Sequence, residues 1–341
     1  MLPIDLPIID INEFSTCEER REMADDGKSL TQIQKDDATI KTAIYHALWK
    51  DHVLRAIEYY EIDVHVKNKT VYLYGHIVGT VSQLRVMNAL LAVPGILEIK
   101  NYLVLDDKLT LEVAASLAGL EHTYSCKFFT GASHGAVSLN GTVNDQNIKS
   151  LAERCAASNP NVRGVINNVR VLGTEPETQD QPFLQPAIGE TIYFSDGLSG
   201  VVKQVIINPN NRRVIAMAVQ GNFREPRNVL HSLFDGNAKP LEQLILVPIK
   251  TIRYLTKVSG FLYINSNERN LYQDFDPTSF YAPNRDWTPP YPYCPDEVLF
   301  PVEHRITDID NTGWTHQFPF AETLDSPSFK EQLFENDSLG G

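Results

Sequence analysis

Cysteine is scarce in this sequence, with 4 residues in a chain of 341. The cysteines are far apart and show no CxxC spacing, so we expect neither a disulfide framework nor a zinc site and predict reduced thiols. The chain also lacks an apolar run of about 18 residues, and it begins without the basic, apolar start of a secretory signal. We therefore expect no membrane span and predict a cytoplasmic protein. The four residues are Cys17, Cys126, Cys155 and Cys294.

Basic charge is also in short supply, because the chain carries a net charge of −13. Residues 1–37 hold 10 acidic against 4 basic side chains, residues 38–265 hold 19 against 22, and residues 266–341 hold 14 against 4. The negative charge is therefore held at the two ends. Binding to nucleic acid needs a concentrated basic surface that neutralises phosphates, so we do not expect nucleic acid as a partner.

Signatures of catalysis are missing as well. The 9 histidines form no HxxxH or HExxH pair, so no zinc site is predicted. The stretch "GASHG", Gly131 to Gly135, spells GxSxG, but a nucleophile elbow needs a helix after the serine, and here a strand pattern follows. We interpret it as a hairpin loop. Cys126 and Cys155 occupy apolar-face positions and are predicted to pack in a core. We predict no enzyme, no cofactor and no metal.

What the sequence does contain is a repeat. The stretch "VYLYGHI", Val71 to Ile77, returns 66 residues later as "VSLNGTV", Val137 to Val143. A helix pattern follows each copy, "VSQLRVMNALLAV" and "NDQNIKSLAERCAAS", and then a closing strand, "PGILEIKNYLVL" and "PNVRGVINNVRV". Opening helices precede the copies around residues 40–48 and 109–117. The predicted order of elements is α-β-β-α-β, twice.

The first strand of each copy is predicted from alternation. In "IDVHVK", Ile62 to Lys67, apolar and polar residues alternate, and Asn68-Lys69 predicts a tight hairpin turn. In the second copy we expect the strand at "YSCKFF", with Tyr124, Cys126 and Phe128 inward. The longer loop "TGASHGA" is then expected to join it to the glycine strand.

These residues resemble the BON domain, a small α+β module, in the order of elements, the V-x-L-x-G-x-[VI] strand and the closing strand. The resemblance covers residues 36–106 and 107–173. It implies a structural role for Gly75 and Gly141, and a glycine at a strand end independently predicts a close approach that a Cβ would block. Asn161 stands where the first copy has Gly95. Since asparagine tolerates a left-handed turn, we expect the fold to be kept.

The chain changes character after the repeat. Residues 174–186 combine prolines with acids and predict a linker, and residues 187–265 show short strands with good turn chemistry. Residues 187–265 resemble the PRC-barrel, which implies a small all-β barrel. The positions that carry this resemblance are Ile188-Gly189, Tyr193, Asp196-Gly197, Gly200, Val202, Leu246-Val247-Pro248 and Ile252.

Two arms flank these modules, an acidic N-terminal arm at residues 1–35 and an acidic C-terminal arm at residues 266–341. The C-terminal arm alternates aromatic residues with prolines, which favours an extended path. It is predicted either to wrap its own barrel or to dock on a neighbouring subunit, with disorder as a third alternative. The candidate interface residues are Phe280, Tyr281, Trp287, Tyr291 and Tyr293.

The fold class is thus predicted as α+β: two α-β-β-α-β modules, a small all-β barrel and an extended arm. We predict a non-enzymatic scaffold that self-associates, with copies of itself as partners. The alternatives are an adaptor that binds a membrane surface, another protein, a small ligand or an ion through the BON-like modules, and a ribosome-assembly factor that acts through the barrel. Because BON-like modules usually follow an export signal, an envelope-associated or extracellular location by a non-standard route is the alternative to the cytoplasm.

Overall fold

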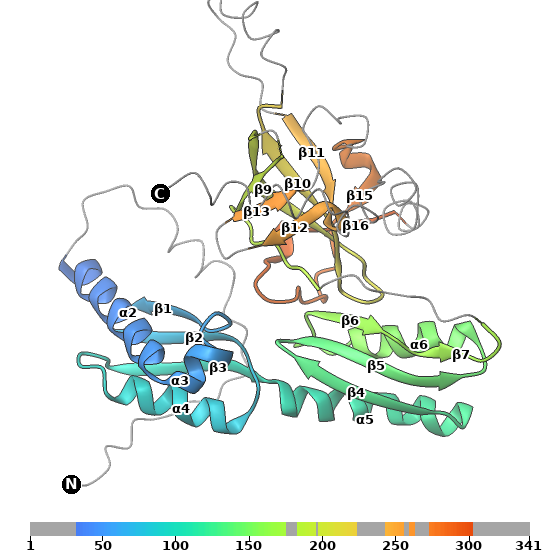
Figure 1. Cartoon of the computed structure of the whole chain (residues 1–341), viewed down its shortest axis with the longest axis horizontal. Coiled ribbons are helices and arrows are strands. Elements are labelled where there is room, and N and C mark those ends of the chain that lie inside the picture. Colours follow the sequence, from blue (N-terminus) through green and yellow to red (C-terminus); the bar gives the residue numbers. More distant parts are fainter. Residues whose placement is uncertain are drawn as a thin grey trace, which may run out of the picture. The chain divides into compact units, whose positions relative to one another are not determined.

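The computed structural model describes residues 32–174, 183–195, 197–223, 243–255, 259–262 and 273–302. These residues divide into two compact units (Figure 1). The first unit holds residues 32–174, 183–187, 207–214 and 282–298, and the second unit holds the remaining described residues. Most of the predicted N-terminal arm, part of the linker and residues 303–341 lie outside the described residues. The predicted domain boundaries stay predictions.

The first module is a three-stranded sheet in the order β1-β2-β3 with helices on one face (Figure 1). Strands β1 and β2 are antiparallel, and β3 runs parallel to β2 after the crossover through α4. The core lies between the sheet and the helices, because alternate strand residues point to opposite faces. The elements are α2 (Gln32–Lys50), α3 (His52–Ile57), β1 (Asp63–Lys67), β2 (Thr70–Ile77), α4 (Thr80–Leu91) and β3 (Glu98–Leu105).

The second module repeats this topology. Strands β4 and β5 are antiparallel, and β6 and β7 both run parallel to β5. Its opening helix buries Leu109, Val113 and Leu117, as predicted from the spacing. The predicted order of elements is therefore confirmed in both modules. The elements are α5 (Asp106–Tyr124), β4 (Lys127–Ser133), β5 (Ala136–Val143), α6 (Gln146–Ala157), β6 (Gly164–Asn167) and β7 (Arg170–Val171).

The hairpin of the second module differs from the prediction. Tyr124 ends helix α5 and the strand begins only at Lys127, so the predicted start of the strand at "YSCKFF" is wrong, whereas Phe128 lies in the strand and is buried as predicted. Most of "TGASHGA" lies in strands, since Ser133 pairs with Ala136 across a two-residue turn. Positive φ values at the two turn residues make this turn possible, as they do at Asn68 and Lys69 in the first module. The reading of "GASHG" as a hairpin, and not as a nucleophile elbow, is confirmed.

The repeated glycines have the predicted structural role, although each strand continues two residues beyond its glycine. Gly75 has φ +119°, and a Cβ there would lie 1.9 Å from the Glu61 carbonyl oxygen. Gly141 has φ +144°, and its Cβ would lie 2.5 Å from the Lys127 carbonyl oxygen. Gly95 has φ +92°, whereas Asn161 is not among the described non-glycine residues with positive φ, and the closing strand follows Asn161 as expected.

The second unit contains a mixed, curled sheet in the order β12-β13-β8-β9-β10-β11-β14, to which β15 and β16 attach (Figure 1). Strands β8 and β9 are antiparallel and lie on either side of Gly197, which has positive φ. This sheet fits the all-β expectation, and a PRC-type barrel stays a prediction. The elements are β8 (Thr191–Tyr193), β9 (Ser199–Ile207), β10 (Val214–Gly221), β11 (Gln243–Pro248), the 3₁₀ turn Ile249–Thr251, β12 (Ile252–Leu255), β13 (Ser259–Leu262), β14 (Gln273–Asp274), the 3₁₀ turn Pro277–Ser279, β15 (Phe280–Tyr281), the 3₁₀ turn Pro295–Glu297 and β16 (Val298–Pro301).

Candidate functional site

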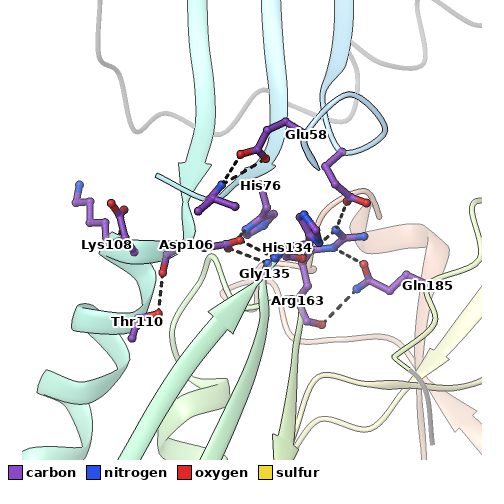
Figure 2. Close-up of polar contacts among 12 residues, drawn as sticks. Glu58, His76, Asp106, Lys108, Thr110, His134, Gly135, Arg163 and Gln185 are labelled. Atoms are coloured by element: carbon purple, nitrogen blue, oxygen red, sulfur yellow. Dashed lines mark hydrogen bonds and ion pairs between the residues drawn. The ribbon is translucent and has the colours of Figure 1, made fainter. Parts of the chain in front are cut away.

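The main buried polar cluster lies at the junction of the two modules. Strand β3 ends at Leu105 and helix α5 begins at Asp106, so the first module runs into the second without a linker. This connection brings the end of β2 beside the start of α5 and beside the turn between β4 and β5. Figure 2 shows His76, Asp106, His134, Gly135 and Arg163 converging there from different elements. The cluster is called the junction below.

Asp106 organises the junction. Its carboxylate is only 3% exposed, and it accepts hydrogen bonds from the backbone N–H groups of His134 at 2.6 Å and Gly135 at 2.9 Å. Burial by itself raises the pKa of Asp106, but the contact with His76 and the two N–H groups outweigh burial and hold this pKa below its usual value. Asp106 is therefore ionised at neutral pH and fixes the hairpin turn to the helix start.

The first module uses the same device. Asp37 of α2 accepts hydrogen bonds from the N–H groups of Asn68 and Lys69, both at 2.8 Å. Sequence reasoning missed this pair of aspartates. A signal was present, because an aspartate precedes the first buried apolar residue of each opening helix by three positions, as Asp37 before Ile40 and as Asp106 before Leu109. The repeat therefore includes a buried carboxylate that holds its own hairpin turn.

His76 is the partner of Asp106 from the first module. The ring is 2% exposed, and its Nδ1 lies 3.5 Å from Asp106 Oδ1. Burial lowers the pKa of His76 because the charged form loses its hydration, and Asp106 opposes this shift only in part. The imidazole is therefore neutral at neutral pH. Its Cε1 is so close to Gly135 that a Cβ there would approach it to 2.6 Å, so the turn needs glycine at this point.

Arg163 ties a third element to the junction. Its Nη1 donates to Glu61 Oε2 at 3.3 Å and to the His134 carbonyl oxygen at 3.1 Å. Its Nε donates to Gln185 Oε1, and Gln185 Nε2 donates in return to the Arg163 carbonyl oxygen (Figure 2). One guanidinium thus contacts the first module, the turn of the second module and residue 185. Such a planar, multidentate cation suits a fixed joint better than a lysine does.

The polar contacts of the junction connect the two modules. A histidine beside an aspartate can act as a base only if a substrate or nucleophile can reach its other nitrogen, and His76 is buried. Across the described residues, no group of three or more His, Cys, Asp and Glu side chains is placed to hold a metal ion. Within the same residues, no helix is long and apolar enough to cross a membrane.

Arg212 forms a second anchor within the first unit. It is 2% exposed, and its guanidinium donates to the carbonyl oxygens of Ala157 and Asn159 at 3.3 Å and of Thr288 at 2.6 Å. Burial lowers the pKa of Arg212 to about 10, so the side chain stays charged at neutral pH. A cation at the C-terminal end of α6 is favoured by the helix dipole. Arg212 therefore attaches the segments around residues 207–214 and 288 to the second module.

The predicted interface residues occupy different environments. The Arg212 guanidinium lies 5.0 Å from the Trp287 ring centroid, and Tyr293 is 2% exposed and donates to the Pro186 carbonyl oxygen at 2.7 Å. Phe280 packs against the core of the second unit, whereas Tyr281 is 47% exposed. Tyr291 lies on the first module and is described below. An interface role for these residues stays a prediction.

The cysteines follow the prediction only in part. Cys126 and Cys155 are free thiols that are partly buried against the core of the second module. Burial raises the pKa of the Cys126 thiol, which disfavours the reactive thiolate. Cys294, however, is disulfide-bonded, so the expectation that all the thiols are reduced is wrong. Widely spaced cysteines can meet in three dimensions, and spacing along the chain does not report it.

The described fold and junction define a class of protein: a tandem repeat of small α+β modules joined by a buried polar contact. The family model of the BON domain matches residues 36–107 and 131–173. This match supports the tandem BON-like organisation. Its second segment begins inside β4, so most of α5 is left out of the match.

Other comparisons add little. No curated protein matches the chain. Two solved structures of CdsD, described as a structural protein of the type III secretion system of Chlamydia trachomatis, show distant likeness. One is 10% identical, with 44% of this chain and 100% of that chain covered and a TM-score of 0.20. The other, the C-terminal domain of CdsD, is 11% identical, with 37% and 96% covered and a TM-score of 0.19. These scores are too low to carry an argument about fold or function.

Proposed function

We propose that the chain is a non-catalytic scaffold that self-associates through its BON-like modules and terminal segments. The observation that carries the proposal is the junction, whose charged groups hold two modules together. Asp106 is occupied by a turn, Arg163 by Glu61 and Gln185, and His76 is buried. Modules that are joined through buried contacts can present their surfaces together to a partner. The match of the BON domain over two segments supports a binding or scaffold role.

Edge strands on both modules support self-association. In the described sheets, β1 lies at one edge of the first module and β4 at one edge of the second. An edge strand presents N–H and C=O groups that can pair with another chain. On β4 the side chain of Phe129 is exposed, which adds apolar area beside that edge. Contacts of this type between identical chains build closed rings or open fibres, according to the rotation between copies.

Light scattering and mass photometry of the full chain across the micromolar range test the proposal. We expect a mass that rises with concentration, and rings or fibres in electron micrographs. Phe129→Lys places a charge beside the edge of β4 and is expected to lower the mass at a given concentration. The matched control is Leu172→Lys, which alters another exposed apolar side chain away from β4. A constant monomer mass throughout this range would overturn self-association.

A second candidate function is an adaptor for a membrane surface. Val81, Leu84 and Leu91 of helix α4 are exposed and lie on one side of the helix by their spacing. The neighbouring helix α3 exposes Val53 and Ile57. Flotation of the full chain with anionic and zwitterionic vesicles tests this function, with Leu84→Ser as the variant. The net charge of −13 leads us to expect no flotation with anionic vesicles. Absence of flotation with the zwitterionic vesicles as well would exclude the adaptor function. Three further points stay predictions: that the chain contacts ribosomes through its barrel, that nucleic acid is not a partner, and the compartment in which the protein works.

A further inference from the structure

The face of the first sheet that lies opposite the helices carries a row of aromatic side chains. Tyr74 and Tyr102 stack with centroids 5.2 Å apart and an angle of 6° between the rings. The His65 ring lies edge-on to Tyr74 at 5.7 Å, and the Lys100 ammonium lies 5.2 Å from the Tyr72 ring centroid. Aromatic residues on a sheet face that is not covered by helices are typical of a binding surface. This set of residues is called the aromatic face below.

Part of the aromatic face is occupied by Tyr291 of the same chain. The Tyr291 ring lies over Tyr74 with centroids 6.5 Å apart and an angle of 15° between the rings. Its hydroxyl group donates to Asp63 Oδ2 at 3.0 Å. Asp63 is also contacted by His65 Nε2 at 3.0 Å. Tyr291 therefore contacts the aromatic face in two ways: its ring lies on the ring of Tyr74, and its hydroxyl group binds the Asp63 carboxylate.

The occupying segment has the composition of a peptide ligand. Tyr291 lies in "PPYPY", residues 289–293, where the Tyr293 N–H donates to the Pro290 carbonyl oxygen at 3.0 Å and closes a turn around Tyr291. The prolines on both sides restrict the backbone of this turn. Prolines of this kind lower the entropy lost on binding and leave the tyrosine ring available for contact. Tyr102 stacks on Tyr74 and is half-buried, so the aromatic face includes more than the ring on which Tyr291 lies.

The division of the chain into two units favours exchange of the Tyr291 segment between copies. Residues 282–298 belong to the first unit, whereas the described residues on both sides of them, up to Tyr281 and from Leu299, belong to the second. A short segment that is connected at both ends to residues of the second unit but groups with the first can bind the identical surface of another copy, since the contacts are the same in both cases. The local concentration favours the internal contact in dilute solution, and rising protein concentration favours exchange.

We propose that the aromatic face is a binding surface for the Tyr291 segment and accepts this segment from a second copy of the chain as well as from its own. This inference rests on the self-association proposed above and names the surface and the ligand for it. The ligand is a proline-flanked tyrosine whose ring stacks on Tyr74 and whose hydroxyl binds Asp63. Exchange of these segments then links neighbouring copies.

Two full-length variants test exchange. Tyr291→Ala removes the ligand and Asp63→Ala removes the acceptor, while Tyr193→Ala alters an exposed tyrosine of the second unit and serves as the control. From the ring stack and the charged hydrogen bond, we expect each of the first two variants to associate roughly 10- to 100-fold more weakly than wild type. Mixing the two variants restores one intact contact in each mixed pair, so association between differently labelled variants should exceed that of either alone.

A peptide measurement is independent of self-association. A labelled peptide of residues 286–293 should bind the Tyr291→Ala protein, whose face is vacant, more tightly than wild type, and should not bind the Asp63→Ala/Tyr291→Ala double variant. If wild type associates but neither variant weakens it and mixing has no effect, exchange is overturned and the scaffold function stands. If wild type is a monomer, self-association fails, and exchange fails with it. Equal peptide binding by wild type and Tyr291→Ala would overturn the binding surface itself.

Discussion

Substitution of Gly75 by alanine is expected to destabilise the first module strongly. At φ +119°, the added Cβ would lie 1.9 Å from the Glu61 carbonyl oxygen. Because this oxygen belongs to the backbone, no side-chain rotation relieves the contact, and the chain must shift by roughly 1 Å or more. The perturbation therefore acts on the pairing of β1 with β2, which forms one edge of the module.

The magnitude follows from three contributions. Backbone strain at this φ costs about 1–3 kcal/mol, and the forced overlap costs about 1–3 kcal/mol. Alanine recovers about 0.4–1 kcal/mol by restricting the unfolded chain. Both costs lie in the upper half of their ranges at Gly75, about 2–3 kcal/mol each, so we expect a net loss of about 3–5 kcal/mol in the free energy of unfolding.

Two matched glycines separate overlap from strain. Gly141→Ala places its Cβ 2.5 Å from the Lys127 carbonyl oxygen and should cost less than Gly75→Ala. Gly173→Ala, at φ +84° with nothing within 4 Å, meets strain alone and should cost about 1 kcal/mol. Urea unfolding followed by circular dichroism measures the loss of stability in each variant. Hydrogen exchange of the β1 and β2 amides shows whether the loss in Gly75→Ala lies at this strand pair. Equal losses for Gly75→Ala and Gly173→Ala would refute the close-approach argument.

Three further outcomes are expected from the junction and the Arg212 anchor. Asp106→Asn and Asp37→Asn should each lower the free energy of unfolding by about 1.5–3 kcal/mol. Only Asp106→Asn should speed hydrogen exchange at the turn between β4 and β5, and equal exchange there in both variants would contradict the role of Asp106. Because burial lowers the pKa of His76 below 6.5, the unfolded chain takes up a proton that the folded chain does not, so stability should fall as pH drops below 6.5, by at most about 1.4 kcal/mol per pH unit. His76→Gln should remove this part of the slope in urea titrations, and an unchanged slope would show that His76 is not its source. Arg212→Lys keeps the charge but loses the planar fork and should cost about 1–3 kcal/mol in calorimetry; wild-type stability in this variant would exclude the fork as the anchor.

Much of the fold could be predicted from the sequence, because helix faces and repeated units follow from periodic patterns of apolar residues. The apolar spacing of Ile40, Ile44 and Leu48 predicts the buried face of α2, and all three residues are buried. The 66-residue match between the glycine strands predicts a duplicated unit, and the two sheets share their topology. The strand before "GASHG" was misplaced because Tyr124 and Cys126 alternate like a strand although helix α5 extends through Tyr124. In that case the continuation of the helix outweighed the local pattern.

The junction was beyond the reach of the sequence patterns for a different reason. His76 and Asp106 are 30 positions apart, and each reads in isolation as an ordinary polar residue. Only the folded chain removes both from water and places them 3.5 Å apart. The same holds for Tyr291 and Asp63, which meet although they are separated by 228 positions.

The sequence by itself determined the repeated α-β-β-α-β unit, its helix faces and the need for glycine at positions 75 and 141. These properties are local, because they follow from side-chain periodicity and from the backbone angles that a residue without a Cβ can adopt. The tertiary structure alone decided which polar groups became buried partners and which aromatic residue covered the open sheet face. Those choices depend on the distance and desolvation of groups far apart in the chain, and a linear pattern specifies neither.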